Sequence, residues 1–211
     1  MKYPKYTTYE KIYKRFFNKG VDYLIEKGNL QISDKVLDIC GGNGRLTKKL
    51  KEKCKDVSYL DQEKDMIPDE LKELGIKVYN QSIENFVNDT KEKYTKVFCE
   101  QAINYWLLNI DVEKFSNIFE KDGLFIFNTF SKKPPVKPMI KEYVIDNINY
   151  LEISYLVDNK VEHIQIREAF EPHFTVFDWI SKEQYINLLS PYFEVEILDD
   201  GVSSLYICRR K

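Results

Sequence analysis

The segment 36–44, Val-Leu-Asp-Ile-Cys-Gly-Gly-Asn-Gly, constrains the fold of this chain more than any other stretch. Its apolar start predicts a short strand, its glycines predict a tight turn, and the apolar spacing of 45–50 predicts a helix. A strand, a glycine turn and a helix in this order bring backbone N–H groups and a helix N-terminus close to a ligand. The sequence therefore predicts an α/β fold that binds a nucleoside-like cofactor at this turn.

The position of the acid in this segment decides which cofactor the turn would bind. A dinucleotide fingerprint needs a small residue where this chain has Thr47. Asp38 instead lies on the strand before the glycines, where it could face a cationic amino group. The stretch resembles the first motif of class I S-adenosylmethionine-dependent methyltransferases, which Asp38, Gly42 and Gly44 match. Cys40 occupies the first glycine position of that motif, which implies a negative φ and a slightly altered turn. The alternative is an α/β turn that binds no ligand.

A second acid follows the next predicted strand. The strand covers 57–60 and ends in Asp61, 23 residues after the acid of the first motif. A carboxylate at the tip of the second strand can accept hydrogen bonds from both ribose hydroxyls. The loop 62–66 follows, and Met66 could cover one face of the adenine. The alternative role for Asp61 is an N-cap for the predicted helix 68–74.

Three further strands are predicted at 76–81, 96–99 and 124–128. In the resembled family, an acid that contacts the adenine amino group often stands where this chain has Ser82, whose hydroxyl could still bond there. The last of these strands follows Asp122-Gly123, a pair typical of the end of a helix. Open α/β sheets place their chemistry at the carboxyl ends of the strands.

The motifs over residues 36–130 are similar in order and spacing to those of class I methyltransferases. The resemblance implies an α/β, Rossmann-like, doubly wound and mostly parallel sheet with an antiparallel last strand and a small antiparallel β insert. With 211 residues, 43% of them hydrophobic, the chain can bury one substantial core. We expect a single methyltransferase domain, 1–211, with an N-terminal helical lid (1–30), a cofactor-binding half (31–132), a β-rich substrate-covering insert (137–180) and a closing helix and hairpin (181–211).

The predicted insert is hairpin-like. Residues 148–157 and 161–169 alternate on either side of a turn candidate at 158–160, and 173–179 could extend this small sheet. In the family, such inserts often cover the pocket of members that act on small metabolites. The alternatives are a structural extension and a dimer surface.

The two ends of the chain carry different signals. Family members often fold a comparable N-terminal segment over the cofactor, with a tyrosine near its carboxylate, so Tyr9 and Tyr13 are the candidates here. The alternative is an amphipathic helix packed on the sheet. At the other end, Ser181 to Gln184 form a capping box that opens a helix, and 193–198 with 203–208 predict a terminal hairpin.

Composition and charge argue against several classes of protein. The chain lacks an apolar run of 18 residues and a signal-peptide core, so we expect a cytoplasmic protein that does not enter a membrane. The four cysteines show no C-x-x-C spacing and the chain has only two histidines, so we expect no metal site. The net charge of −2 and the dispersed lysines disfavour a nucleic-acid substrate, and the short basic run 132–137 reads as a solvated loop.

An acceptor that must lose a proton needs a base. His173 is the best candidate because histidine titrates near neutral pH and Pro172 fixes its local geometry; the alternative is a structural histidine. His163 lies in mid-strand on the polar face, where we expect it to be exposed. Tyr105 and Glu100, at the end of the fourth strand, are the other catalytic candidates.

These observations together predict an S-adenosylmethionine-dependent methyltransferase that methylates oxygen or nitrogen on a small molecule, as a monomer or homodimer. The alternatives are an RNA or protein methyltransferase and a noncatalytic cofactor-binding partner subunit, and an exposed apolar patch without an enclosed pocket would favour the last. The predicted cofactor-binding residues are Tyr9, Tyr13, Asp38, Cys40, Gly41, Gly42, Asn43, Gly44, Asp61, Gln62, Met66, Ser82, Ile83, Glu100 and Gln101.

Overall fold

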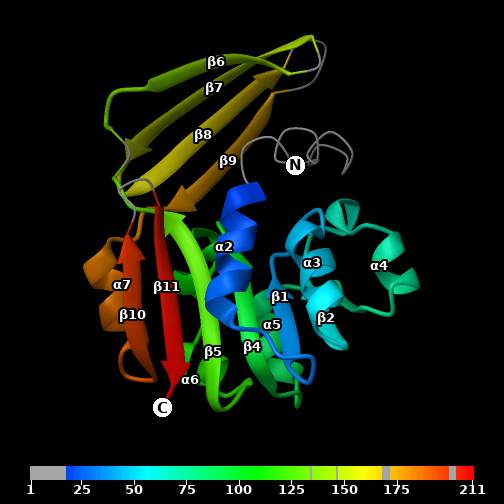
Figure 1. Cartoon of the computed structure of the whole chain (residues 1–211). Helices are drawn as coiled ribbons and strands as arrows, with labels where there is room; N and C mark the ends of the chain where they lie inside the picture. The colour runs from blue at the N-terminus through cyan, green and yellow to red at the C-terminus, as the bar shows by residue number, and fades with distance from the viewer. Residues whose placement is uncertain (1–17, 134, 146, 168–171, 200–202) are drawn as a thin grey trace.

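The computed structural model describes residues 18–133, 135–145, 147–167, 172–199 and 203–211, and it contains two sheets of unequal size (Figure 1). The larger sheet has seven strands in the order β10-β11-β5-β4-β1-β2-β3. β1 to β5 pair in parallel, and β11 is antiparallel to both of its neighbours. The predicted doubly wound, mostly parallel sheet is confirmed. Its strands are β1 (Lys35–Ile39), β2 (Asp56–Leu60), β3 (Lys77–Tyr79), β4 (Tyr94–Glu100), β5 (Phe119–Phe130), β10 (Phe193–Asp199) and β11 (Ser203–Arg210).

Helices cover both faces of this sheet. One apolar cluster packs α5, α6 and α7 on one face, and a second packs α2, α3 and α4 on the other. No helix in the described ranges is long and apolar enough to cross a membrane. The helices are α2 (Asn18–Gly28), α3 (Arg45–Lys53), α4 (Glu70–Glu73), α5 (Ile83–Asp89), α6 (Val112–Ser116) and α7 (Lys182–Leu189), and the short 3₁₀ turns are η1 (Lys64–Met66), η2 (Ile103–Tyr105) and η3 (Leu107–Asn109).

Local sequence signals explain where several of these helices start. The predicted capping box of α7 is confirmed, because the hydroxyl of Ser181 accepts from the N–H of Gln184, and the Gln184 side chain accepts from the N–H of Ser181. α3 begins directly after the left-handed Gly44. The capping box satisfies N–H groups of α7 that have no partner inside the helix.

β5 contains an irregularity at a residue pair that we predicted to end a helix. Asp122 and Gly123 lie inside this strand, and Asp122 has a φ of +61°. The pairing of β5 with β4 shifts register there, as it does at a β-bulge. The prediction of a C-capped helix at Asp122-Gly123 is therefore wrong, because the pair supplies its left-handed residue to a kink within a strand.

The smaller sheet has four antiparallel strands in the order β6-β7-β8-β9 and stands over the carboxyl ends of the parallel strands (Figure 1). The predicted antiparallel insert is confirmed, including its turn at Asp158 and Asn159, which both have positive φ. The first strand of this sheet was not predicted from the sequence. Its strands are β6 (Met139–Ile145), β7 (Ile148–Val157), β8 (Lys160–Arg167) and β9 (His173–Asp178).

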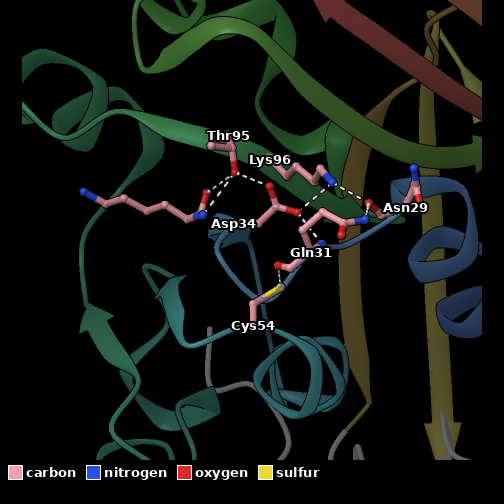
Figure 2. A network of polar contacts seen from close by, with 7 residues as sticks. Asn29, Gln31, Asp34, Cys54, Thr95 and Lys96 are labelled. Atoms are coloured by element: carbon pink, nitrogen blue, oxygen red, sulfur yellow. Dashed lines mark hydrogen bonds and ion pairs between the residues drawn. The ribbon is translucent and has the colours of Figure 1, made fainter.

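A buried polar network ties the loop before β1 to β4 (Figure 2). Asp34 accepts hydrogen bonds from the N–H of Gln31 at 2.7 Å and from the hydroxyl of Thr95 at 3.0 Å. The Lys96 ammonium lies 2.7 Å from Asp34 and donates to the carbonyl oxygen of Asn29, also at 2.7 Å. The Lys96 and Asp34 side chains are only 10% and 11% exposed. The network lies at the N-terminal edge of β1 and β4, the edge opposite the glycine turn.

Candidate active site

The glycine turn after β1 is built from left-handed backbone. Cys40, Gly42 and Gly44 have φ values of 54°, 50° and 70°. The prediction of a negative φ at Cys40 is therefore wrong. The chain bends toward β2 as soon as β1 ends, and the N–H of Gly41 donates to the carbonyl of Leu60 at 3.2 Å. A cysteine in this conformation carries backbone strain that a glycine would avoid.

Space, rather than φ, explains the second residue of the turn. A Cβ on Gly41 would lie 2.4 Å from the ring of Tyr59. That ring is fully buried, and its hydroxyl donates to the carbonyl of Gly42 at 2.7 Å. Tyr59 thus packs against Gly41 and bonds to the backbone of the turn. The sequence predicted that Tyr59 lies in a strand but did not predict this contact.

The Asp61 carboxylate is held at the tip of β2 by backbone groups. It accepts hydrogen bonds from the N–H of Gly42 at 2.9 Å and from the N–H of Glu63 at 2.8 Å. Asp61 is only 8% exposed, and this burial raises its pKa even though the two N–H groups oppose the shift. The N-cap of α4 is Asp69. Asp61 therefore does not cap that helix.

Asp38 interacts electrostatically with Asp61 and with a further acid, Glu100, whose side chain is 15% exposed. Asp38, which is 1% exposed, accepts a hydrogen bond from the hydroxyl of Thr47 at 2.5 Å. Burial, together with the charges of Glu100 and Asp61, raises the pKa of Asp38 to about 8. Burial also raises the pKa of Glu100, although Arg45 lies 2.5 Å away and opposes the shift. A cationic ligand placed here would offset the repulsion among these carboxyl groups.

The segment after β4 supports the smaller sheet. The N–H of Gln101, whose φ is +52°, donates to the side-chain oxygen of Asn128 at 2.9 Å. The side-chain amide of Asn104 donates to the carbonyl of Asp178, in β9, at 2.8 Å. Its oxygen accepts from the hydroxyl of Thr129 at 2.7 Å. The Asn104 side chain thus connects β9 to the larger sheet.

A cavity of about 210 Å³ lies where the smaller sheet faces these strand ends. Its floor comes from residues at or just beyond the ends of β1 to β4, and β8 and β9 supply the other side. No group of His, Cys, Asp and Glu side chains in the described ranges could hold a metal ion. The cavity is lined by Ile39, Cys40, Gly42, Leu60, Asp61, Gln62, Glu63, Met66, Gln81, Ile83, Ala102, Tyr105, Trp106, His163, Gln165 and Thr175.

The cavity brings together part of the predicted site. Its lining includes Cys40, Gly42, Asp61, Gln62, Met66, Ile83 and Tyr105 and leaves out Asp38, Gly41, Asn43, Gly44, Ser82, Glu100 and Gln101. The Ser82 hydroxyl serves as the N-cap of α5 and accepts from the N–H of Asn85. Tyr9 and Tyr13 lie outside the described residues, as does the side chain of His173, whose backbone begins β9. The role of each residue stays a prediction.

Several lining residues were missed from the sequence. His163, Gln165 and Thr175 reach the cavity from β8 and β9, and Trp106 reaches it from the segment after β4. The expectation that His163 is exposed is wrong, because its side chain is only 23% exposed. The alternation of β8 places His163 and Gln165 on one face. Alternation could not indicate which face of the strand meets the larger sheet.

Comparisons with known proteins bear on the fold. No family model and no curated protein matches this sequence. Among solved structures, an S-adenosylmethionine-dependent methyltransferase from Clostridium acetobutylicum is 18% identical with a TM-score of 0.76, covering 97% of this chain and 98% of its own. An amino pentose methyltransferase from Micromonospora echinaspora, solved with S-adenosylmethionine bound, is 12% identical with a TM-score of 0.74 over 100% of both chains. A sugar N-methyltransferase from Streptoalloteichus is 13% identical with a TM-score of 0.71, covering 100% of this chain and 94% of its own. The chain therefore has the class I methyltransferase fold.

Proposed function

We propose that this chain is an S-adenosylmethionine-dependent methyltransferase acting on oxygen or nitrogen of a small molecule. The observation that carries the proposal is Asp61, a buried carboxylate that lines the cavity beside the glycine turn. Its two backbone hydrogen bonds fix it at the tip of β2, where a carboxylate can accept from both hydroxyls of a ribose.

The residues around Asp61 fit the rest of the cofactor. Met66 and Ile83 line the cavity with apolar surface suited to an adenine ring, and Gln62 and Gln81 supply amides for polar edges. Gly42 lines the cavity without a side chain, so a ligand can lie directly on this part of the turn.

The buried charges also fit this cofactor, which carries a sulfonium, an ammonium and a carboxylate. The carboxyl groups of Asp38, Asp61 and Glu100 favour the two cationic groups of the ligand. Arg45, which lies at the start of α3 and pairs with Glu100, is a cation beside this cluster that could attract a carboxylate. A dinucleotide, with its anionic pyrophosphate, would meet repulsion here.

When bound, S-adenosylmethionine supplies an activated methyl group on sulfur, so the protein's main task is to hold the acceptor. Tyr105, His163, Gln165 and Thr175 line the cavity and offer hydroxyl, imidazole and amide groups to a polar acceptor. Within the chain 1–211, which we propose acts as a single methyltransferase domain, residues 31–132 would bind the cofactor and 137–180 would cover the acceptor.

A small-molecule acceptor agrees better with the cavity than the alternatives do. The smaller sheet covers the strand ends, whereas an RNA or protein substrate needs an open groove. The outward face of this sheet does expose Ile140, Val144 and Val176, as a partner-binding subunit would. Its inner face nevertheless lines a cavity, which supports catalysis. Two of the similar structures methylate sugars, and one of them is a sugar N-methyltransferase, which favours nitrogen as the acceptor.

Calorimetry with S-adenosylhomocysteine tests this proposal. The wild-type chain should bind it, and Asp61→Asn should weaken binding by about 1 to 3 kcal/mol, because hydrogen bonds to a charged group are lost. Asp69→Asn is the matched control, since it removes the same charge from an exposed position outside the cavity lining. Tighter binding of NAD, or equal affinities for Asp61→Asn and the wild type, would overturn the proposal.

A further inference from the structure

The inner face of the smaller sheet carries a cluster of polar side chains above the cavity. Ser154 pairs with His163, and Glu152 pairs with Gln165, across β7 and β8. Thr175 pairs with His163 from β9, so the cluster spans three strands. The residues between them along each strand point to the outward face, which is largely apolar. A sheet that only covered a core would turn its apolar face inward. This one presents polar groups to the cavity.

The members of this cluster bond to one another. The side-chain amide of Gln165 donates to Glu152 Oε1 at 2.9 Å. The Ser154 hydroxyl lies 2.7 Å from His163 Nδ1, and His163 Nε2 lies 3.9 Å from Glu152 Oε1. The Ser154 hydroxyl therefore fixes the imidazole through Nδ1, and the Glu152 carboxylate lies beyond hydrogen-bond distance of Nε2, where it would stabilise a protonated ring.

The charges around the cavity select the kind of acceptor. Its lining contains the carboxylates of Asp61 and Glu63 but, within the described residues, no Lys or Arg side chain. Glu152 adds a third acid next to His163. Lys141 pairs with Glu152 across β6 and β7, so the net charge at that side of the cavity is smaller. Asp61 and Glu63 would repel an anionic acceptor and attract an ammonium group.

We propose that the acceptor is a small primary or secondary amine, that His163 removes its proton, and that Glu152 is a positioning residue that stabilises the protonated imidazole. The inference rests on the proposed function and deepens it. With Nδ1–H donating to Ser154, His163 Nε2 keeps a lone pair that can accept the proton of an ammonium group. Gln165 holds Glu152 in place on the Nε2 side of the imidazole, where the carboxylate can also attract the ammonium group.

The surroundings of His163 leave its ring neutral near pH 7, as a base must be. Burial lowers the pKa of His163; Glu152 on β7 opposes this shift, and Lys141 on β6 adds to it.

The proton and electron pairs balance in this scheme. An acceptor R–NH₃⁺ gives one proton to His163, and the N–H bonding pair stays on nitrogen as a lone pair. That pair forms the new N–CH₃ bond while the S–CH₃ pair leaves with sulfur, so the methylated product is again an ammonium ion. His163 then releases its proton to water.

Nuclear magnetic resonance of the two histidines tests the inference in the full chain. In the protein saturated with S-adenosylhomocysteine, 2-aminoethanol should shift the His163 ring signals, while ethylene glycol should shift them less and glycolate should leave them unchanged. The three probes share a two-carbon skeleton and differ in charge. Equal shifts with glycolate, or none with 2-aminoethanol, would overturn the amine assignment. Since cofactor binding is measured separately, that result would leave the proposed function standing, whereas failure to bind S-adenosylhomocysteine would remove both.

The role of Glu152 is tested by titrating His163. Glu152→Gln should lower the pKa of His163 by about half a unit or more and weaken the binding of 2-aminoethanol about tenfold. Glu152→Asp, which keeps the charge, should retain most of the wild-type His163 pKa and most of the wild-type affinity for 2-aminoethanol. Glu162→Gln is the matched control, because Glu162 lies on the outward face and bonds to Tyr155. An unchanged His163 pKa in Glu152→Gln, or equal changes in Glu162→Gln, would overturn the pairing. The probe series on the wild type needs no variant to fold.

Discussion

Cys40 is the residue at which the sequence and the backbone disagree most clearly. Its φ of 54° suits glycine, so Cys40→Gly removes both the thiol and the strain, whereas Cys40→Ala removes the thiol alone. We expect Cys40→Gly to be more stable than Cys40→Ala by about 1 kcal/mol, because a left-handed residue with a Cβ costs about that much. Urea unfolding of the two variants measures the difference. Equal free energies of unfolding would mean that the strain at Cys40 is negligible.

We expect Asp38 to make the affinity for the proposed cofactor depend on pH. With its pKa raised to about 8, Asp38 is mostly protonated at pH 7 in the free protein. A cationic ligand favours the ionised form, so binding below this pKa must release a proton. The affinity should therefore rise with pH, by at most about tenfold per unit, and level off above pH 8.

Calorimetry of S-adenosylmethionine binding in buffers with different ionisation enthalpies measures this proton release directly. Asp38→Asn is expected to bind more weakly and to show a flatter dependence on pH. The same number of protons released by the variant and by the wild type would assign the effect to another group, such as Glu100.

At the scale of the element, the sequence predicted those strands and helices whose signals lie within a few neighbouring residues. β1 and α3 follow from 36–50, and α7 follows from its capping box. Asp122-Gly123 was misread because a left-handed Asp before Gly ends a helix and bulges a strand equally well, and only the pairing with β4 decides. The cavity face of β8 was missed for a similar reason. His163 and Gln165 alternate with apolar residues, and either face could have met the larger sheet.

Asn104 tests how the smaller sheet is attached. Asn104→Ala removes its hydrogen bonds to Asp178 and Thr129 at a position that is 5% exposed. The free energy of unfolding should fall by about 1 to 3 kcal/mol, since buried partners lose their bonds. Amides of β9 should also exchange hydrogen faster than those of β1. Asn109→Ala, an exposed asparagine in the next turn, is the control. A uniform change in exchange across both sheets would argue against a local attachment.

Over the whole molecule, the proposed site and the Asp34–Lys96 network lie at opposite ends of the parallel strands. The carboxyl ends of the strands hold strained backbone and buried acids whose raised pKa values reflect uncompensated burial. The other edge holds the compensated network around Asp34 and Lys96 (Figure 2). Changes at this second edge should therefore alter the free energy of unfolding without altering cofactor affinity.

The Asp34–Lys96 pair gives that separation a measurable form. Burial alone would raise the pKa of Asp34, but bonds from Gln31, Lys96 and Thr95 outweigh it and lower the pKa. Because the pKa of Asp34 is lower in the folded state, its carboxylate stabilises the fold fully at pH values above the unfolded-state pKa of about 4. This contribution is lost as the pH falls through the folded-state pKa.

Asp34→Asn should destabilise the protein by about 3 kcal/mol at pH 7, because it leaves the Lys96 ammonium buried without its counter-ion. The difference in free energy of unfolding between the variant and the wild type should narrow toward pH 3, where Asp34 itself becomes protonated. Asp22→Asn breaks the pair with Lys49, in which the Asp22 side chain is 64% exposed, and should cost less than about 1 kcal/mol at either pH. Urea unfolding at both pH values, together with S-adenosylhomocysteine calorimetry, measures all three chains. A gap for Asp34→Asn that stayed constant with pH, or a loss of ligand affinity in the folded variant, would contradict the assignment of this network to stability alone.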